Sequence, residues 1–553
     1  MELFNTVKLL RLIVPFIESV SDLYAKCFKL WMLIPPIMFS LLLSCDDKES
    51  KIEQPNQIFK TYFGDLHNHN SVGYAKGSLQ RSFDIARSHL DFYALTPHSQ
   101  WHDIPIMEGD RHLHWENGFK KTKDQWGNVQ NMVKKYNDPG SFITLSGFEW
   151  HSSYYGDYCI ISKENDLPLN IFPDVESLQK YAKDEGALII PHHPGYLQGR
   201  RGANFDYLNT EVSPVLEIYS EHGNAESVDG PFPYIRHSMG GRSLTNTLQD
   251  ALASGYRMGV VASTDDHLGY PGAYGEGLAA VLAEDLTRES IFSAIKKRRT
   301  YAVSGDRIKL DFRLNHHYMG EQIPFTSERR ITLDVSGWDK IDRIEILKNN
   351  RVIKRQFPAD NLVNPSSWDK PILLRIELGW GPWKDLDLSR ICDWEADVQI
   401  TDGKLIDVYP CFQSGPFSET RKNKITDKTK DGFRLRTYTS RNQAFMENPT
   451  NAVVLSISGN AKTKVALTLQ EPVEMTVSKS LGELKDNNAV FFTGEFPAES
   501  FVFHPVVFSD NYTSKFEFTD ISSTNEDVNW YYVRVIQANG QMAWSSPIWV
   551  ENL

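Results

Sequence analysis

The fold of this chain is decided by the stretch Tyr62-Phe63-Gly64-Asp65-Leu66-His67-Asn68-His69. A short apolar run with the length of a buried strand ends directly in two histidines spaced two residues apart. Side chains alternate in direction along extended backbone, so both imidazoles project to the same side. The stretch therefore predicts a buried strand that delivers two metal-binding side chains at its carboxyl end.

Five further apolar runs along the chain are likewise predicted strands, and each contains or is followed by His, Glu or Asp. They are Phe92–Thr96 with His98, Phe142–Ser146 with Glu149 and His151, Ala187–Pro191 with His192 and His193, Val215–Tyr219 with His222, and Met258–Ser263 with Asp265 and His267. In βα barrels the pocket forms at the carboxyl ends of the strands, where residues distant in sequence converge. Imidazoles with carboxylates hold zinc, manganese or iron, and carboxylates can bridge two ions.

Helix-like segments separate these runs, at residues 79–90, 175–185, 244–254 and 288–297. Asp174 and Thr287 stand at N-cap positions, and Gly186 and Gly255 where helices stop. Repeated βα units predict an α/β fold with a parallel barrel or open sheet over residues 61–305. Residues 306–553 read as a β-rich, sandwich-like accessory domain, with a hairpin at the Asn349-Asn350 turn.

Composition limits the classes of function. With 553 residues and 63.2 kDa the chain exceeds one compact domain. A hydrophobic fraction of 41% with 24% charged residues is typical of a globular protein. The net charge of -12 argues against nucleic acid as a partner, because phosphate backbones attract basic surfaces.

The N-terminus predicts an export signal. Residues 29–44 are mostly apolar, too short and too interrupted by proline for a membrane span, and Leu43-Ser44-Cys45 resembles the lipobox of bacterial lipoproteins. We expect residues 1–45 to form a leader ending at a lipidated Cys45 and residues 46–60 a tether. The protein would then be anchored in the bacterial cell envelope, at the outer membrane or facing the periplasm. A buried or interfacial helix is the alternative, and pairing of Cys392 with Cys411 stays open.

Taken in order, the strand-end motifs resemble those of the PHP (polymerase and histidinol phosphatase) superfamily over residues 61–305. The motifs are Asp65-Leu-His67-Asn-His69, Thr96-Pro-His98, Glu149, His193-Pro194 and Thr264-Asp265-Asp266-His267. The resemblance implies a distorted (β/α)7 barrel with a metal cluster. It would place His67, His69, Glu149 and Asp265 around one ion, His98 and His267 at a second, and Glu149, His193 and His222 at a third. Of the adjacent His192 and His193, the one preceding proline fits the pattern better.

This sequence departs from the family pattern at two places. Pro97 stands where the usual Thr-Asp-His motif has a carboxylate. No histidine follows His69 until His89, although one is often found soon after the first motif. We therefore expect one or two divalent ions, manganese, zinc or iron.

Two reactions are consistent with such a site. The resemblance implies hydrolysis of phosphoesters with metal assistance, with the substrate phosphate held by arginines such as Arg200, Arg201, Arg236 and Arg242. The alternative, which the envelope address and the many aromatic residues favour narrowly, is elimination from an acidic, uronic-acid-containing oligosaccharide by a dehydratase or lyase. There the metal and Arg201 would hold the carboxylate, and His151 or a tyrosine such as Tyr155 would remove the α proton. A third hypothesis is a glycan-binding lipoprotein without catalysis.

Overall fold

The computed structural model describes residues 58–230, 243, 245–361, 367–379, 381, 391–441, 450–522 and 528–552. Within these, Phe59 to Leu553 belong to one compact unit. The predicted leader, the lipidation site Cys45, most of the tether, and Arg236 and Arg242 lie outside the described residues. Every helix in the described ranges is too short or too polar to cross a lipid bilayer.

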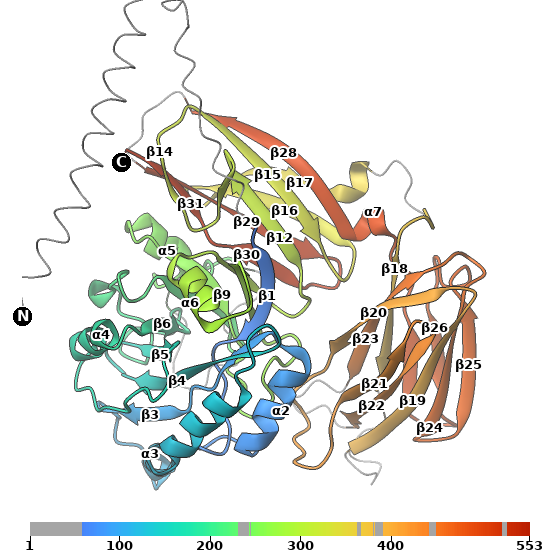
Figure 1. Cartoon of the computed structure of the whole chain (residues 1–553), viewed down its shortest axis with the longest axis horizontal. Coiled ribbons are helices and arrows are strands. Elements are labelled where there is room, and N and C mark those ends of the chain that lie inside the picture. Colours follow the sequence, from blue (N-terminus) through green and yellow to red (C-terminus); the bar gives the residue numbers. More distant parts are fainter. Residues whose placement is uncertain are drawn as a thin grey trace, which may run out of the picture. The chain divides into compact units, whose positions relative to one another are not determined.

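The first half of the unit alternates strands with helices (Figure 1). Its strands are β1 Lys60–Asp65, β2 Phe92–Ala94, β3 His98–Trp101, β4 Ile143–His151, β5 Asp157–Ser162, β6 Leu188–His192, β7 Val215–Ser220, β8 Gly223–Asn224, β9 Gly259–Ala262, β10 Leu278–Ala283 and β11 Thr300–Val303. Its helices are α2 Leu79–His89, α3 Arg111–Tyr136, α4 Val175–Asp184, α5 Leu248–Ala253 and α6 Arg288–Lys296, with a 3-10 turn η2 at Phe205–Tyr207.

The strands of this half pair in both directions. β1 with β2, β2 with β4, β3 with β4 and β7 with β9 are parallel, whereas β10 with β1, β4 with β5 and β5 with β6 are antiparallel. The ladders of the described strands leave the ring open, because β7, β8 and β9 form a sheet of their own. The mixed α/β class is confirmed, the uniformly parallel sheet is wrong, and closure into a (β/α)7 barrel stays a prediction.

Helix starts follow local capping chemistry. The Asp174 side chain accepts the backbone N–H of Ser177 to open α4, and Thr287 accepts that of Ser290 to open α6. The longest of the described helices, α3 with 26 residues, has no predicted counterpart. Asp110 stands at its N-cap but its side chain makes no capping hydrogen bond, and few positions of the helix are buried, so the sequence has no strong apolar stripe there.

The second half is built almost wholly from strands. They are β12 Lys309–Leu314, β13 His317–Tyr318, β14 Gln322–Pro324, β15 Glu328–Ser336, β16 Ile341–Lys348, β17 Arg351–Gln356, β18 Ile372–Leu378, β19 Ile391–Thr401, β20 Lys404–Cys411, β21 Lys424–Thr429, β22 Gly432–Ser440, β23 Asn451–Ser458, β24 Lys464–Glu471, β25 Met475–Ser480, β26 Ala489–Phe492, β27 Ser500–Phe503, β28 Thr513–Ile521, β29 Val528–Gln537, β30 Met542–Ser545 and β31 Ile548–Glu551. A 3-10 turn η3 (Pro358–Asn361) and a short helix α7 (Ser509–Tyr512) interrupt them. Asn349 and Asn350 adopt positive φ in the β16–β17 turn, as the hairpin prediction requires.

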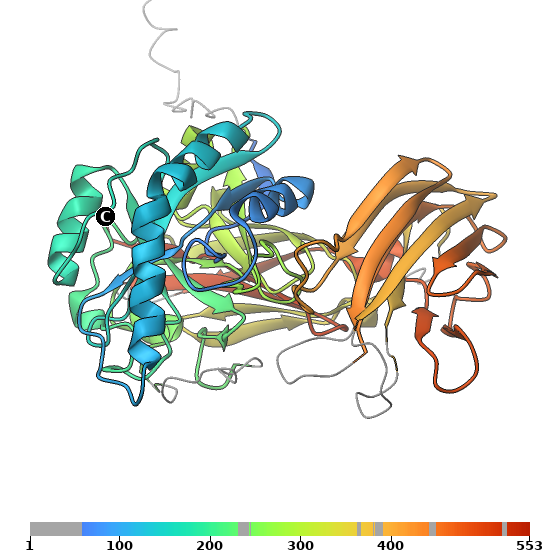
Figure 2. The same ribbon diagram turned by 90° about the horizontal axis from the view of Figure 1, so that it is seen from below.

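Strands β18 to β27 form two five-stranded sheets (Figure 2). Apolar side chains from both sheets, among them Leu374 of β18 and Trp394 of β19, share one buried core. Cys392 lies in that core, whereas Cys411 belongs to a separate cluster, and both thiols are free. This part of the chain is therefore a sandwich, and Cys392 and Cys411 are not paired in it.

The predicted boundary at residues 305 and 306 falls inside one hydrogen-bonded sheet. Strand β11 of the first half pairs with β30 near the end of the chain, and β11 also pairs with β10, which pairs with β1. Buried Glu226 accepts hydrogen bonds from Tyr532 Oη at 2.8 Å and Trp544 Nε1 at 2.8 Å, and pairs with Arg534 at 3.2 Å. The C-terminal strands thus extend the sheet that carries the first histidine motif.

Candidate metal centre

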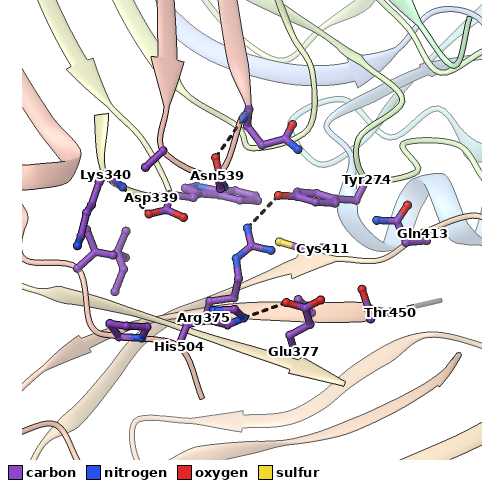
Figure 3. Close-up of a pocket in the computed structure, with 17 residues that line it drawn as sticks. Tyr274, Asp339, Lys340, Arg375, Glu377, Cys411, Gln413, Thr450, His504 and Asn539 are labelled. Carbon is purple, nitrogen blue, oxygen red and sulfur yellow. Dashed lines mark hydrogen bonds and ion pairs between the residues drawn. The ribbon is translucent and has the colours of Figure 1, made fainter. Parts of the chain in front are cut away.

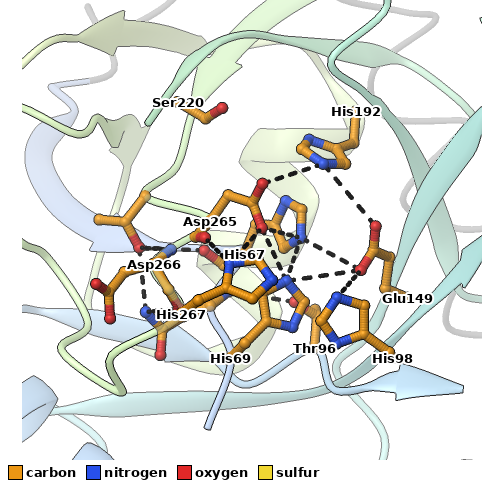
Figure 4. Close-up of polar contacts among 12 residues, drawn as sticks. His67, His69, Thr96, His98, Glu149, His192, Ser220, Asp265, Asp266 and His267 are labelled. Carbon is orange, nitrogen blue, oxygen red and sulfur yellow. Dashed lines mark hydrogen bonds and ion pairs between the residues drawn. The ribbon is translucent and has the colours of Figure 1, made fainter. Parts of the chain in front are cut away.

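The first group of converging ligand atoms surrounds Asp265 (Figure 4). His67 and His69 follow β1, and their Nε2 atoms lie 3.0 Å apart. Asp265 Oδ1 lies 3.3 Å from His67 Nε2 and 2.8 Å from His69 Nε2. All three side chains are buried. The alternation along extended backbone thus brings both histidines of the motif to one carboxylate, as the sequence predicts.

A second group is centred on Glu149, near the end of β4. Its Oε2 atom lies 3.3 Å from His98 Nε2 and 3.5 Å from His151 Nε2. The same oxygen lies 3.6 Å from His69 Nε2, so Glu149 stands between the first group and the second. His151 is thereby placed among the candidate ligands, although the sequence suggested it as a catalytic base.

A third group uses the other carboxylate oxygen of Asp265. Asp265 Oδ2 lies 2.7 Å from His222 Nε2 and 3.3 Å from His192 Nε2. His267 lies beside His69, with ring centroids 4.5 Å apart, and combines with His69 and His98 in a further group. Both oxygens of Asp265 therefore face imidazole nitrogens.

His192, and not His193, points into this cluster. β6 ends at His192, whereas His193 has a positive φ of 30° and its ring stacks on Tyr196 at 3.7 Å. His193 Nε2 lies 3.3 Å from Asp157 Oδ2, outside the groups around Asp265 and Glu149. The preference for the histidine before proline is thus at odds with the geometry, because the backbone turns away from the strand direction at that residue.

Two carboxylates outside the cluster orient its imidazoles: Glu217, which the apolar run at residues 215–219 contains, and Asp157, which was not singled out from the sequence. Glu217 on β7 accepts hydrogen bonds from His192 Nδ1 at 2.8 Å and His67 Nδ1 at 3.2 Å. Asp157 on β5 lies 2.8 Å from His151 Nδ1. When Nδ1 carries the proton, Nε2 presents its lone pair inward, which is the usual way a carboxylate fixes a metal-binding histidine. Asp157 stands opposite His192 in the β5–β6 ladder, a relation that the structure shows and the sequence does not.

The carboxylates and imidazoles of the cluster shift one another's pKa values. Burial raises the pKa of Asp265, but His67 and His192 outweigh it and hold that pKa well below the usual range. Burial and the neighbouring His69 lower the pKa of His98. Burial lowers the pKa of His192, but Asp265 and Glu217 outweigh it and raise that pKa to about 9, so a divalent cation that binds beside Asp265 would displace a proton from this imidazole.

Arg201 lies next to the cluster and forms a buried ion pair with Asp157. Its Nε donates to Asp157 Oδ2 at 2.7 Å, and its guanidinium lies 5.2 Å from the Trp101 ring and 5.5 Å from the Trp115 ring. Tyr155 lies away from the cluster, where its ring packs against Tyr207 at 4.9 Å. The structure therefore brings together all the predicted metal ligands except His193, places Arg201 at their edge, and leaves Tyr155 outside.

Tyr74 lies beside His98, one of the candidate ligands. Its half-buried ring stacks on His98 at 3.9 Å and meets Trp115 of α3 at 4.5 Å. Burial raises the Tyr74 pKa well above its ordinary value, so the phenol stays neutral. The rings of Tyr74 and Trp115 thus border the candidate ligand His98.

The unpaired atoms of the cluster test whether its residues fit a cation. Glu149 Oε2 and His151 Nε2 are buried without a hydrogen-bond partner among the described residues. Buried polar atoms are almost always satisfied, and an unsatisfied set of imidazole and carboxylate atoms within 4.8 Å of one another has the composition of a metal site. The residues present therefore fit divalent cations.

Comparisons with known proteins give partial matches. A family model described as "Protein of unknown function (DUF3604)" matches residues 272–324. A protein of Chlamydia muridarum is 27% identical over 265 residues, 43% of this chain and 42% of its own length, and one of Chlamydia pneumoniae is 26% identical over 277 residues, 45% and 43% respectively. Both are described as "Uncharacterized protein". The matched region spans about two fifths of the length of these relatives.

A solved structure from Bacteroides vulgatus is similar over 76% of this chain and 95% of its own, with 12% sequence identity and a TM-score of 0.29. It is described as a two-domain protein containing a predicted PHP-like metal-dependent phosphoesterase.

The elimination reaction preferred from the sequence is corrected by these findings. The similar solved chain is described as containing a predicted metal-dependent phosphoesterase, a class of hydrolase. Of the side chains assigned to elimination, Tyr155 lies outside the cluster, where its ring packs against Tyr207. His151 bonds Asp157 through Nδ1 and faces Glu149 through Nε2, so it has the position of a ligand.

Proposed function

We propose that this chain is a metal-dependent hydrolase of phosphoesters, related to the PHP superfamily, whose site holds two divalent cations. The observation that carries the proposal is the placement of two buried carboxylates, Asp265 and Glu149, each between separate sets of imidazole nitrogens. Carboxylates in that position bridge neighbouring ions. The nitrogen and oxygen donors suit manganese, zinc or iron.

When bound, the cations would supply an activated water and would neutralise charge that develops on the phosphoryl group. The chain's own residues determine how a substrate reaches them. His67, His69 and Glu149 are closed off from solvent, whereas the side chains of His222 and His267 are 20% and 33% exposed. A phosphoryl group would therefore approach from the side of His222 and His267.

Arg201 would contribute a fixed positive charge at the edge of the site. Its ion pair with Asp157 and its contacts with the Trp101 and Trp115 rings hold the guanidinium in one position, and 8% of the residue remains exposed. A planar, preoriented guanidinium is suited to phosphate oxygens. Arg201 would thus orient a substrate oxygen, while Asp157 keeps the Arg201 guanidinium from moving into the cluster.

The test combines metal content with hydrolysis. The purified protein is loaded with Mn²⁺, Zn²⁺ or Fe²⁺, its metal is counted by mass spectrometry, and release of p-nitrophenol is followed from p-nitrophenyl phosphate and bis-p-nitrophenyl phosphate. We expect His67→Ala to lose both metal and hydrolysis, and His317→Ala to lose neither, because His317 is an exposed partner of Glu321. Full hydrolysis of either ester by a metal-free protein would disprove the proposal.

A further inference from the structure

A second cavity, of about 480 Å³, lies apart from the metal centre (Figure 3). Three regions of the chain line it: Tyr274 in the loop that follows the Asp265 motif, the turns at residues 338–340 and 538–541, and the sandwich strands around Arg375 and Glu377. It shares no lining residue with the groups of candidate metal ligands. The volume falls within the range of roughly 300–1,000 Å³ in which proteins bind small molecules.

The side chains that line this cavity carry charges of both signs, because Arg375 and Lys340 are basic and Asp339 and Glu377 are acidic. Arg375 donates to Tyr274 Oη at 2.9 Å and pairs with buried Asp306 at 3.3 Å. Glu377 Oε2 lies 2.9 Å from His504 Nε2. A ligand with a net charge would face both signs at close range and would lose its hydration without gaining an unopposed partner.

Polar and aromatic groups nevertheless remain turned toward the space. Tyr274, Gln413, Thr450 and Asn539 line it together with Trp338, and Figure 3 shows the Tyr274 ring above the Arg375 guanidinium. Arg375 Nε is buried without a hydrogen-bond partner among the residues that the structure describes. Amides, a hydroxyl and an unpaired N–H next to flat apolar rings match ligands that carry many hydroxyls on one edge and C–H groups on a face.

We propose that this cavity binds a neutral, hydroxyl-rich ligand of one or two sugar rings. Paired charges such as Arg375 with Asp306 offer residual donors and acceptors to hydroxyl groups, and the Tyr274 and Trp338 rings cover the apolar face of a sugar. The site is independent of the metal centre and of the proposed hydrolysis. It makes the junction between the sandwich and the rest of the unit a place of saccharide recognition.

Titration calorimetry on the full chain tests the proposal with glucose and cellobiose as probes, and glucuronate and glucosamine as charged counterparts. We expect a neutral sugar to bind and its charged counterpart to bind about tenfold more weakly. Chelation of metal and the His67→Ala substitution should leave sugar binding unchanged, which separates this site from the metal centre. Loss of sugar binding after chelation would overturn the proposal.

A matched pair of variants locates the site. Glu377→Gln keeps the shape of the side chain but removes the pairing with His504, and it should weaken sugar binding about tenfold, the worth of one charge-assisted hydrogen bond. Lys479→Ala changes a partly exposed residue of β25 that does not line the cavity, and it should bind as the unaltered chain does. Absence of binding by both neutral sugars at millimolar concentration, or equal binding by Glu377→Gln, would refute the inference, as would preferential binding of a charged sugar.

Discussion

Replacing Asp157 with Asn probes the outer support of the metal centre. Asp157 is fully buried, and its Oδ2 lies 2.7 Å from Arg201 Nε and 2.8 Å from His151 Nδ1. Asn keeps the shape of the side chain but removes the negative charge. The buried Arg201 cation would lose its partner, and His151 would lose the acceptor that directs its Nε2 toward Glu149.

Two magnitudes follow from this geometry. Removing one partner of a buried ion pair costs about 3–5 kcal/mol, and Asn retains an acceptor oxygen, so we expect a loss near the lower end of about 3 kcal/mol. Loss of a carboxylate that supports a metal-binding histidine weakens metal affinity about 10- to 100-fold, or roughly 1.4–2.8 kcal/mol. Asp157→Asn should therefore lower both the unfolding free energy of the metal-free chain and the affinity of the cation beside His151.

Denaturant titration measures the first effect, and competition with a chelator, followed by metal counting, measures the second. Asp397→Asn is the matched control, because Asp397 pairs with Arg434 on an exposed face and should change neither quantity. In the background of Arg201→Met, Asp157→Asn should cost less stability, since no buried cation is left unpaired. Wild-type stability together with wild-type metal affinity in Asp157→Asn would refute the reasoning.

Three other predictions concern different parts of the chain. Burial and the Arg307 guanidinium lower the pKa of His89 to about 3, so between pH about 6.5 and pH about 3 only the unfolded state takes up a proton. The unfolding free energy should therefore fall by about 1.4 kcal/mol for each pH unit across this range. His89→Gln should flatten this slope in denaturant titrations, and an unchanged slope would contradict the assignment. Gly64→Ala would place a Cβ 2.3 Å from the Phe92 ring and backbone oxygen, where β1 pairs with β2. This clash should lower the unfolding free energy by about 1–3 kcal/mol in the same assay. An unchanged unfolding free energy would mean that the neighbouring residues shift at little cost. If Cys45 carries a lipid anchor, Cys45→Ala should move the protein from the membrane to the soluble fraction after cell lysis, and a variant that stays in the membrane fraction would show another anchor.

The cluster could be anticipated because strand-end position and residue type are both local signals. His67, His69 and Asp265 converge because alternation along a strand fixes which side chains share a side, and a buried apolar run marks the strand itself. The choice between His192 and His193 was not readable in this way. It depends on the positive φ at His193, which follows from how the chain leaves β6 and not from its residue type.

Features that depend on long-range packing were missed. Asp157 and Glu217 occupy ordinary strand positions, and only the folded ladders bring them to the outer nitrogens of His151, His67 and His192. The direction of β5 and β10 was also not predictable, because an apolar run has the same appearance in parallel and antiparallel pairings. Helix α3 was also not predicted, since its packing against the strands stabilises it more than its own sequence pattern does.

The pairing of β11 with β30 has a consequence for how the protein is made. Residues 300–303 leave the ribosome about 240 residues before Ala543 and Trp544, their partners in the ladder. Until then, the β10–β11 edge next to β1 has unsatisfied backbone groups and stays open to unwanted strand pairing. The histidines that follow β1 are consequently held by a sheet that is completed only when synthesis reaches β30. The site would therefore mature late. Chaperone protection of the β11 edge would matter most while the β-rich half is translated.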